Sequence, residues 1–412
     1  MTGDTELAER LIGRFFRYLA VTSQSDFAGT TVPSTAWQWD MIRLLEQELR
    51  GFGLTEIHID PHACLTVRVP GNVPGAPRLG FCAHVDTVDV GLSPHIKPQR
   101  VQFTGADFCL NKEQDIWFRV ADHPEVLPYI GQELLVSDGT SVLGADDKSA
   151  VTILMDILGE LAKGGRRHGD IVVAFVPDEE IGLRGAKVMD LSYFPVDFAF
   201  TIDSTELGEF VYETFNAANA VITITGVPAH PIAAKGVMVN PVLIAADLVS
   251  RFDPLDTPEN SEGREGYCYV NSLASNANTA TVKVSLRDFD AGGLAARKAR
   301  VEQIVAEVQA AHPRAKVEAA IEDGYRNIAD SLGNDRSCVE LLERGFAAEG
   351  ITPKVIALRG GTDGAMLSMR GIPTPNYFTG GLNFHSRYEF LPVPAFVTTY
   401  RLTDTLCRLA AG

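Results

Sequence analysis

Ser141-Val-Leu-Gly-Ala-Asp-Asp-Lys-Ser-Ala150 places two adjacent carboxylates and a lysine between an apolar lead-in and a helical pattern. Two neighbouring carboxylates repel each other when they are buried, so either one of them has a raised pKa or the pair holds a cation. A cation is the favoured solution where histidines can join the carboxylates as ligands. A metal site built on Asp146 would need further ligands from other segments of the chain.

Three short apolar runs around this stretch are predicted to be strands of an open α/β sheet, with a helix at residues 150–161 between them. The run at residues 171–176 is continuously apolar, which is typical of a parallel strand buried on both faces. Open α/β sheets bind ligands at the carboxyl ends of their strands, so side chains that follow the runs are expected to meet at one edge. The runs span residues 78–83, 171–176 and 196–202, and they lead to His84, Glu180 and Asp203.

A different pattern covers residues 220–322, where the expected elements follow in the order β-α-β-β-α-β, a self-contained unit. We interpret it as an inserted domain, because α/β alternation resumes after it. The predicted fold class is therefore α/β, with a main domain built on a mainly parallel central sheet flanked by helices, and one inserted domain. The predicted boundaries are 1–215 and 326–412 for the two parts of the main domain and 216–325 for the insertion. Residues 91–136 show no strong period and are expected to be irregular or to contain a hairpin.

Composition limits the partners that this chain can have. Its 412 residues include 36 basic and 53 acidic ones, and the net charge of -17 repels phosphate backbones and anionic lipid. No run approaches the roughly 18 apolar residues of a membrane span, and the start is polar and acidic. We therefore expect a small substrate, no nucleic acid or membrane partner, and a cytoplasmic location. The six cysteines are scattered without a C-x-x-C pair, which indicates reduced residues.

Two imidazoles and three carboxylates form a candidate ligand set for two divalent ions such as zinc, cobalt or manganese. If Asp146 bridges, each ion receives one histidine, one terminal carboxylate, one bridging oxygen and a shared water. The charges of two dications, three carboxylates and one hydroxide then cancel. Ions about 3.5–4 Å apart deprotonate such a water near neutral pH and make it a hydrolytic nucleophile. The five predicted ligands are His84, Asp146, Glu180, Asp203 and His385.

Two further acidic residues are candidates for supporting roles. Asp86 lies two residues beyond His84 and could accept the other imidazole N–H, which would fix the ring orientation. Glu179 stands beside Glu180 but faces another direction, which suits a general base that passes a proton to a leaving amine. Taken singly, each of these acidic groups could instead be charge at the start of a helix. Their joint placement after apolar strands favours a site.

Three residues are candidates for substrate binding. His230 lies at a turn and could polarise a carbonyl, although a surface turn histidine is an equally good interpretation. Arg287 and Arg359 could clamp a substrate carboxylate with two hydrogen bonds each. Surface ion pairing is the alternative for both arginines.

In this order, the motifs resemble those of the dinuclear-zinc metallopeptidases, a family that includes aminoacylases, glutamate carboxypeptidases and dipeptidases. Within that family the tripeptide aminopeptidases are the most similar, because of Glu262-Gly-Arg-Glu-Gly266 and Arg287-Asp-Phe-Asp290. The resemblance extends from end to end of the chain. Its other segments are Pro33-Ser-Thr-x-x-Gln-Trp-Asp40, His84-Val-Asp86, Leu143-Gly-Ala-Asp-Asp-Lys148, Pro177-Asp-Glu-Glu-Ile-Gly182, Asp203, His230-Pro, Arg359-Gly-Gly-Thr-Asp-Gly364 and Asn383-x-His385.

The resemblance implies two zinc ions per chain, with cobalt or manganese as possible substitutes. It implies one ion on His84, Asp146 and Asp203. The other ion would lie on Asp146, Glu180 and His385. It further implies Glu179 as the base and Asp86 as the supporting acid, and makes the inserted domain a lid and a possible homodimer surface. His230, Arg287 and Arg359 would then lie at the substrate.

The expected activity is hydrolysis of short peptides with release of the amino-terminal residue. A carboxypeptidase or an N-acyl amino acid amidohydrolase on the same scaffold is the alternative, because the same metals serve all of these reactions. A non-catalytic binding module is disfavoured by the presence of Glu179 together with five ligands. A magnesium-dependent phosphate-handling protein is disfavoured because no Gly-rich loop has the spacing of a P-loop.

Overall fold

Helices and strands alternate along most of the chain, and a computed structural model describes them for residues 2–412. The residues form two units. Unit 1 consists of the chain up to Tyr212, Ser331–Ile356 and Thr362–Gly412, and unit 2 consists of Glu213–Asp330 and Ala357–Gly361. The sequence assigned residues 357–361 to the main domain, whereas the structure groups them with unit 2. Within that unit, Arg359 donates to the carbonyls of Gly263 and Glu265.

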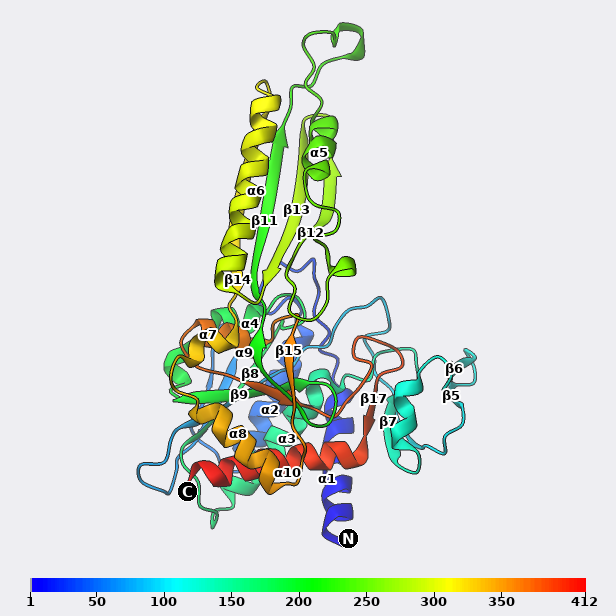
Figure 1. The fold of residues 1–412 in the computed structure, drawn as a ribbon. Helices are drawn as coiled ribbons and strands as arrows, with labels where there is room; N and C mark the ends of the chain where they lie inside the picture. Colours follow the sequence, from blue (N-terminus) through cyan, green and yellow to red (C-terminus); the bar gives the residue numbers. More distant parts are fainter. Residues whose placement is uncertain (1) are drawn as a thin grey trace. The chain divides into compact units, whose positions relative to one another are not determined.

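An eight-stranded sheet with the order β1-β2-β8-β3-β9-β16-β10-β15 forms the centre of unit 1 (Figure 1). Its four central strands, β8, β3, β9 and β16, are parallel, and the apolar runs predicted the first three of them. Antiparallel strands extend it on both sides, so the whole sheet is mixed. The strands are β1 (Ile57–Ile59), β2 (Leu65–Val69), β3 (Leu79–His84), β8 (Ile171–Val176), β9 (Phe198–Ser204), β10 (Glu209–Thr214), β15 (Lys354–Leu358) and β16 (Asn376–Phe378).

Helices cover both faces of this sheet because successive side chains of a strand point to opposite faces. In β3, Phe81 and Ala83 enter the larger core, whereas Cys82 enters the smaller one on the other face. The larger core packs α1 (Thr2–Leu19), α2 (Trp37–Gly51), α3 (Ala145–Ala162), α8 (Ser337–Ala348) and α10 (Val393–Ala410). The other face carries α4 (Arg184–Val188) and α9 (Asp363–Met369), and α7 (Ile328–Leu332) precedes α8.

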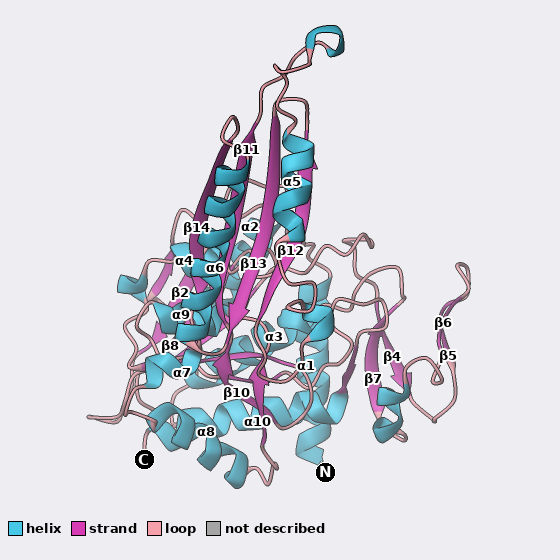
Figure 2. Ribbon diagram, turned by 45° about the horizontal axis from the view of Figure 1, so that its top comes forward, coloured by secondary structure: helices cyan, strands magenta, loops and turns pink. Residues whose placement is uncertain are grey.

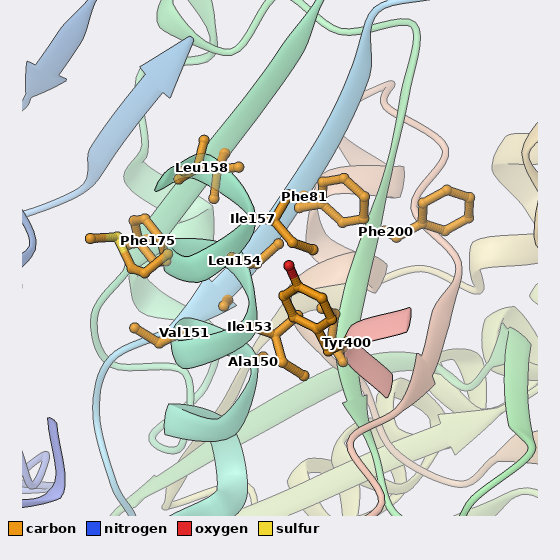
Figure 3. Packing of buried hydrophobic residues seen from close by; sticks show 14 of the residues in the cluster. Phe81, Ala150, Val151, Ile153, Leu154, Ile157, Leu158, Phe175, Phe200 and Tyr400 are labelled. Atoms are coloured by element: carbon orange, nitrogen blue, oxygen red, sulfur yellow. The ribbon is translucent and has the colours of Figure 1, made fainter. Parts of the chain in front are cut away.

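The buried side of α3 packs on the aromatic residues of the central strands (Figure 3). Leu154 is 1% exposed, and Phe81, Phe175 and Phe200 of three neighbouring strands belong to the same core. This packing fixes the helix that begins at the Asp146 stretch against the sheet that carries His84.

Truncation of this core is expected to destabilise unit 1 strongly. Leu154→Ala should lower the free energy of unfolding by about 2–5 kcal/mol, because it removes buried methyl groups and leaves a cavity. Leu127→Ala is the control, since Leu127 is 42% exposed and its loss should change the stability by less than about 0.5 kcal/mol. Urea unfolding of both variants checks this, and equal midpoints would contradict it.

Residues 91–136, which showed no period, contain two small pieces of sheet. Strand β7 (Glu133–Ser137) lies between β4 (Pro98–Gln102) and β17 (Phe390–Pro392) in a three-stranded sheet and pairs with both. Strands β5 (Phe108–Asn111) and β6 (Ile116–Phe118) form a hairpin, one of the two predicted alternatives. Short 3-10 helices lie at Pro124–Tyr129 and elsewhere at Leu191–Tyr193, Pro231–Ala233 and Pro258–Asn260.

Unit 2 has the predicted β-α-β-β-α-β order and an antiparallel sheet with the strand order β12-β13-β11-β14. Figure 2 shows α5 and α6 along this sheet, and their apolar residues share one core with it. Side chains along β11 point alternately to the two faces of the sheet, and one face packs on the helices. Ile222 is buried on that face, while its neighbour Val221 is 39% exposed. The elements are β11 (Asn216–Thr225), α5 (Pro241–Ser250), β12 (Tyr267–Ser275), β13 (Thr279–Asp288), α6 (Ala291–Ala311) and β14 (Lys316–Tyr325).

None of the helices in residues 2–412 combines the length and the apolar composition that a membrane crossing requires. All six cysteines fall within the same residues, and each is a free thiol.

Candidate metal centre and active site

The carboxyl ends of three neighbouring parallel strands bring the predicted side chains to one edge of the sheet. His84 ends β3 and is in register with Val176, the last residue of β8, from which the chain continues to Glu179 and Glu180. Asp203 lies near the end of β9, on the other side of β3. Each of these three strands therefore delivers at least one candidate ligand, as the sequence predicted.

Asp146 lies between two imidazoles. His84 Nε2 is 2.9 Å from Asp146 Oδ1, and His385 Nε2 is 3.2 Å from the other oxygen, Oδ2. The remaining two carboxylates complete the cluster, because Glu180 Oε2 is 2.9 Å from His385 Nε2 and Asp203 Oδ1 is 3.9 Å from His84 Nε2. The structure thus brings all five predicted ligands together around one carboxylate.

This cluster has the donor set and the unmet polarity that divalent cations fit. Ligand atoms of His84, Asp146 and Glu180 lie within 4.8 Å of one another. Glu180 Oε1 is buried and has no hydrogen-bond partner among residues 2–412, so it remains available as a ligand. Burial, together with the charge of Asp146, raises the pKa of Glu180 to about 7. Burial and the same charge raise the pKa of Asp203 well above its usual range.

The carboxylates around the two imidazoles favour the protonated form of each ring. Hydrogen bonds to Asp146 and Glu180 raise the pKa of His385 to about 10. Burial opposes the charged form of His84, but Asp146 and Asp86 outweigh it and raise its pKa well above the usual value. Burial also disfavours the charged form of Asp146, yet its two histidine partners lower its pKa. The histidines and Asp146 thus stabilise each other's charged forms.

Asp86 supports both the histidine and the glutamate turn. His84 Nδ1 is 3.0 Å from the backbone carbonyl of Asp86 and 3.4 Å from its carboxylate oxygen Oδ1, so the carbonyl is the nearer acceptor. The carboxylate also accepts the backbone N–H groups of Glu179 and Glu180, at 3.0 and 3.3 Å. Asp86 is fully buried and links β3 to the segment that follows β8.

Glu179 is partly buried beside this cluster. Burial and the nearby negative charge of Asp203 raise the pKa of Glu179 well above its usual range. A carboxyl group with a raised pKa can take up and release a proton near neutral pH, which is the property that a general base needs.

Asp178 is a positioning residue that the sequence did not single out. It has a left-handed φ of 56°, a strained conformation for a residue other than glycine. Its carboxylate accepts the N–H and hydroxyl of Ser34, at 2.7 and 2.6 Å, and the amide of Gln38, at 2.6 Å. Both partners belong to the Pro33–Asp40 motif, which was the one feature of the sequence that could have pointed to Asp178. These bonds tie the start of α2 to the turn that presents Glu179.

Glu389 is a second residue that the sequence missed. Its carboxylate is buried and accepts four backbone N–H groups at the start of α3, from Leu143, Gly144, Ala145 and Asp146. Burial raises its pKa to about 8 although these donors favour the carboxylate. The only sequence signal was an acidic residue directly before the apolar run that became β17.

Two more buried ionisable groups interact electrostatically with residues of the centre. Lys148 is fully buried and donates from Nζ to the carbonyls of Tyr18 and Val21, and burial lowers its pKa to about 7. Asp363, from the Arg359–Gly364 motif, is 2% exposed, and burial raises its pKa to about 7. Neither carboxylate oxygen of Asp363 has a hydrogen-bond partner within residues 2–412.

The three predicted substrate residues belong to unit 2, and their contacts lie within that unit. His230 is exposed and accepts the N–H of Ile232 at 3.3 Å. Arg287 donates to the carbonyls of Ala218 and Leu286, and Arg359 donates to Gly263, Glu265 and Ser261. Both arginines thus bind backbone carbonyls, and each also lies over an aromatic ring, Arg287 over Tyr325 and Arg359 over Phe215. Arg359 holds the Glu262–Gly266 segment.

The fold and the site define an α/β protein with a candidate two-metal centre at the carboxyl edge of its sheet. Residues 136–408 match the model of peptidase family M20/M25/M40. A peptidase T-like protein of Yersinia pestis is 57% identical, and one of Rhizobium meliloti is 52% identical, each over 98% of both chains. Peptidase T of Geobacillus thermodenitrificans is 39% identical over 98% of both chains. The chain belongs to peptidase family M20/M25/M40.

Solved structures share the fold. Aminopeptidase PepT of Bacillus cereus has a TM-score of 0.75 at 21% identity, over 98% of this chain and 99% of that one. A dinuclear metal-binding peptidase of the M20 family from Bacillus subtilis has a TM-score of 0.67 at 14% identity, over 98% of both chains. Both confirm the predicted architecture of a sheet-based domain with an inserted unit.

Proposed function

We propose that this chain is a metal-dependent aminopeptidase that releases the amino-terminal residue of tripeptides. The observation that carries the proposal is the placement of Asp146, whose two oxygens face different imidazoles. A carboxylate placed in this way could be shared by a pair of divalent ions. Relatives named peptidase T support the substrate class.

In this proposal His84, Asp146 and Asp203 hold one zinc-type ion, and Asp146, Glu180 and His385 hold the other. The charges and the unpartnered Glu180 Oε1 support this assignment. When bound, such ions polarise the scissile carbonyl and lower the pKa of a shared water. Zinc is the ion we propose, with cobalt or manganese as substitutes that the same ligands accept.

The remaining residues handle protons and orientation. Glu179 takes the proton of the attacking water onto its carboxylate and delivers it to the leaving amine. Asp86 and Asp178 hold the backbone on either side of Glu179 and so fix where that carboxylate points. We assign His230, Arg287 and Arg359 to substrate binding, with the arginines as candidates for the substrate carboxylate.

Which end of the peptide is anchored separates the aminopeptidase from a carboxypeptidase or an N-acyl amino acid amidohydrolase. We expect a free tripeptide and its C-terminal amide to be cleaved after the first residue, and the N-acetylated tripeptide to resist cleavage. Mass spectrometry of the products measures this. Cleavage of the N-acetylated peptide at a comparable rate would favour the amidohydrolase instead. All three forms of the peptide are compared because the 57% and 52% identical relatives are named peptidase T-like.

Removal of metal is expected to abolish hydrolysis, and zinc, cobalt or manganese should restore it at about two ions per chain. Affinity should rise from about pH 6 to about pH 9, because His385, with a pKa of about 10, must lose a proton before it binds an ion. Metal analysis and titration at several pH values check both points. Full activity after exhaustive chelation would contradict the proposal.

A cytoplasmic location, a small peptide as the partner and a homodimer formed through unit 2 complete the proposal. Cell fractionation and sedimentation test the location and the dimer.

A further inference from the structure

The carboxylate of Glu389 is bound by four successive backbone N–H groups. Oε2 accepts from Leu143 at 2.8 Å and from Gly144 at 2.9 Å. Oε1 accepts from Ala145 at 2.7 Å and from Asp146 at 3.2 Å. Each oxygen therefore has two donors, and the last donor belongs to the residue that lies between the two imidazoles.

The backbone that supplies these donors has the shape of an anion-binding site. Gly144 has a left-handed φ of 76°, which lets consecutive N–H groups converge on one point. They precede the regular part of α3, because Asp146 (φ -80°, ψ 105°) and Asp147 (φ -118°, ψ 22°) do not have helical backbone angles. These N–H groups therefore have no partner inside the helix. Glu389 is 1% exposed, and no cationic side chain within residues 2–412 pairs with it. The peptide groups thus supply the counter-charge.

Glu389 also closes the loop that presents His385. Leu382 and Phe390 exchange two backbone hydrogen bonds, at 2.9 and 3.1 Å, at the base of this loop. Glu389 N–H donates to the carbonyl of Ser386 at 3.2 Å. His385 itself has a left-handed φ of 59°, and its side chain is 46% exposed, so it needs support from the rest of the loop.

We infer that Glu389 is a positioning residue that sets the separation between Asp146 and His385. One carboxylate joins the two segments, from residues 143–146 and 382–390, that must stay in register for both ligands to reach the same ions. This inference rests on the proposed metal centre and adds to it a residue that touches neither ion. Without Glu389, the His385 loop and residues 143–146 lose four of the hydrogen bonds that join them.

Glu389→Gln tests this with the least change of shape. The amide nitrogen that replaces one oxygen can only donate hydrogen bonds. It would face two backbone N–H groups and could not accept a hydrogen bond from either. We expect the affinity for at least one of the two ions to fall tenfold to a hundredfold, the usual effect of losing a residue that orients a ligand. Titration of the metal-free protein with Co²⁺ against a competing chelator measures the affinity without any assay of hydrolysis.

Asp170→Asn is the matched control. Asp170 also anchors a loop through its carboxylate, which accepts the N–H of Gly71 at 2.7 Å, but it precedes β8 at the opposite end of that strand from the candidate ligands. Its replacement should leave both metal affinities unchanged. A loss in the control as large as the loss in Glu389→Gln would show a general effect of loop anchoring and would overturn the inference.

The outcomes separate this inference from the proposed function. If the unmodified protein binds two ions and Glu389→Gln binds them as tightly, the inference is wrong and the metal centre stands. If the unmodified protein binds none, both are wrong. Should Glu389→Gln fail to fold, Glu389→Asp takes its place, because it keeps the charge but cannot reach all four donors. We expect about a tenfold loss of affinity there, and unchanged affinity would overturn the inference.

Discussion

Glu179→Gln is expected to lower kcat by about 10²–10⁴-fold while the protein keeps both ions. Glutamine has nearly the same size as glutamate but cannot take up the proton of the attacking water, so the proton transfer is lost and the ligands are not. The raised pKa of Glu179, caused by burial and by the charge of Asp203, shows that its surroundings suit such a transfer. Steady-state kinetics and metal analysis of the same preparation measure the two quantities.

Glu180→Gln is the control for this prediction because it changes the neighbouring residue in the same way. Glu180 Oε2 lies 2.9 Å from His385 Nε2, so its change should weaken the binding of one ion as well as the rate. Metal lost from the Glu179 variant but retained by the Glu180 variant would mean that the roles of the two glutamates are reversed.

Asp146→Asn is expected to lose both ions and to retain less than about a thousandth of the activity. The bound ions would stabilise the transition state by several kcal/mol, and each 1.36 kcal/mol of lost stabilisation lowers the rate about tenfold. The amide keeps one acceptor oxygen and loses the charge, so it cannot serve two cations at once. Metal content and kcat/KM measure the loss. Binding of about two ions by this variant would remove the main support for a shared carboxylate.

Asp147→Asn is the matched control, one residue further along the chain. Asp147 is fully buried, and its Oδ2 accepts the backbone N–H of His84 at 3.3 Å, an interaction that an amide oxygen can also make. Its replacement should leave metal bound. The contrast between adjacent positions would show that the effect at Asp146 is a matter of ligation and not of charge alone.

Local sequence was sufficient to predict the strands that build the site. The apolar run at residues 171–176 became β8 with those bounds, and the rule that ligands gather at the carboxyl ends of strands brought His84 and Asp203 to one edge. The β-α-β-β-α-β order of unit 2 was likewise visible, because each strand and helix has its own period.

Contacts between distant segments could not be predicted in the same way. Glu389 and Leu143 are 246 positions apart, and no pattern near either residue shows that backbone N–H groups will meet a carboxylate. One strand pairing was missed for a related reason: β10 and β16 pair antiparallel through residues far apart in the chain. Strands β4 and β7 were also missed, because neither has an apolar alternation of its own.

The candidate ligands are spread from His84 to His385, with unit 2 between them in the chain. During translation, therefore, four of the five ligands leave the ribosome before unit 2, and the fifth leaves it only afterwards. At about 5–20 residues per second, the delay is on the order of ten seconds. A growing polypeptide cannot hold all five candidate ligands in that interval, so we expect no hydrolytic activity from the nascent chain until residue 385 has been made.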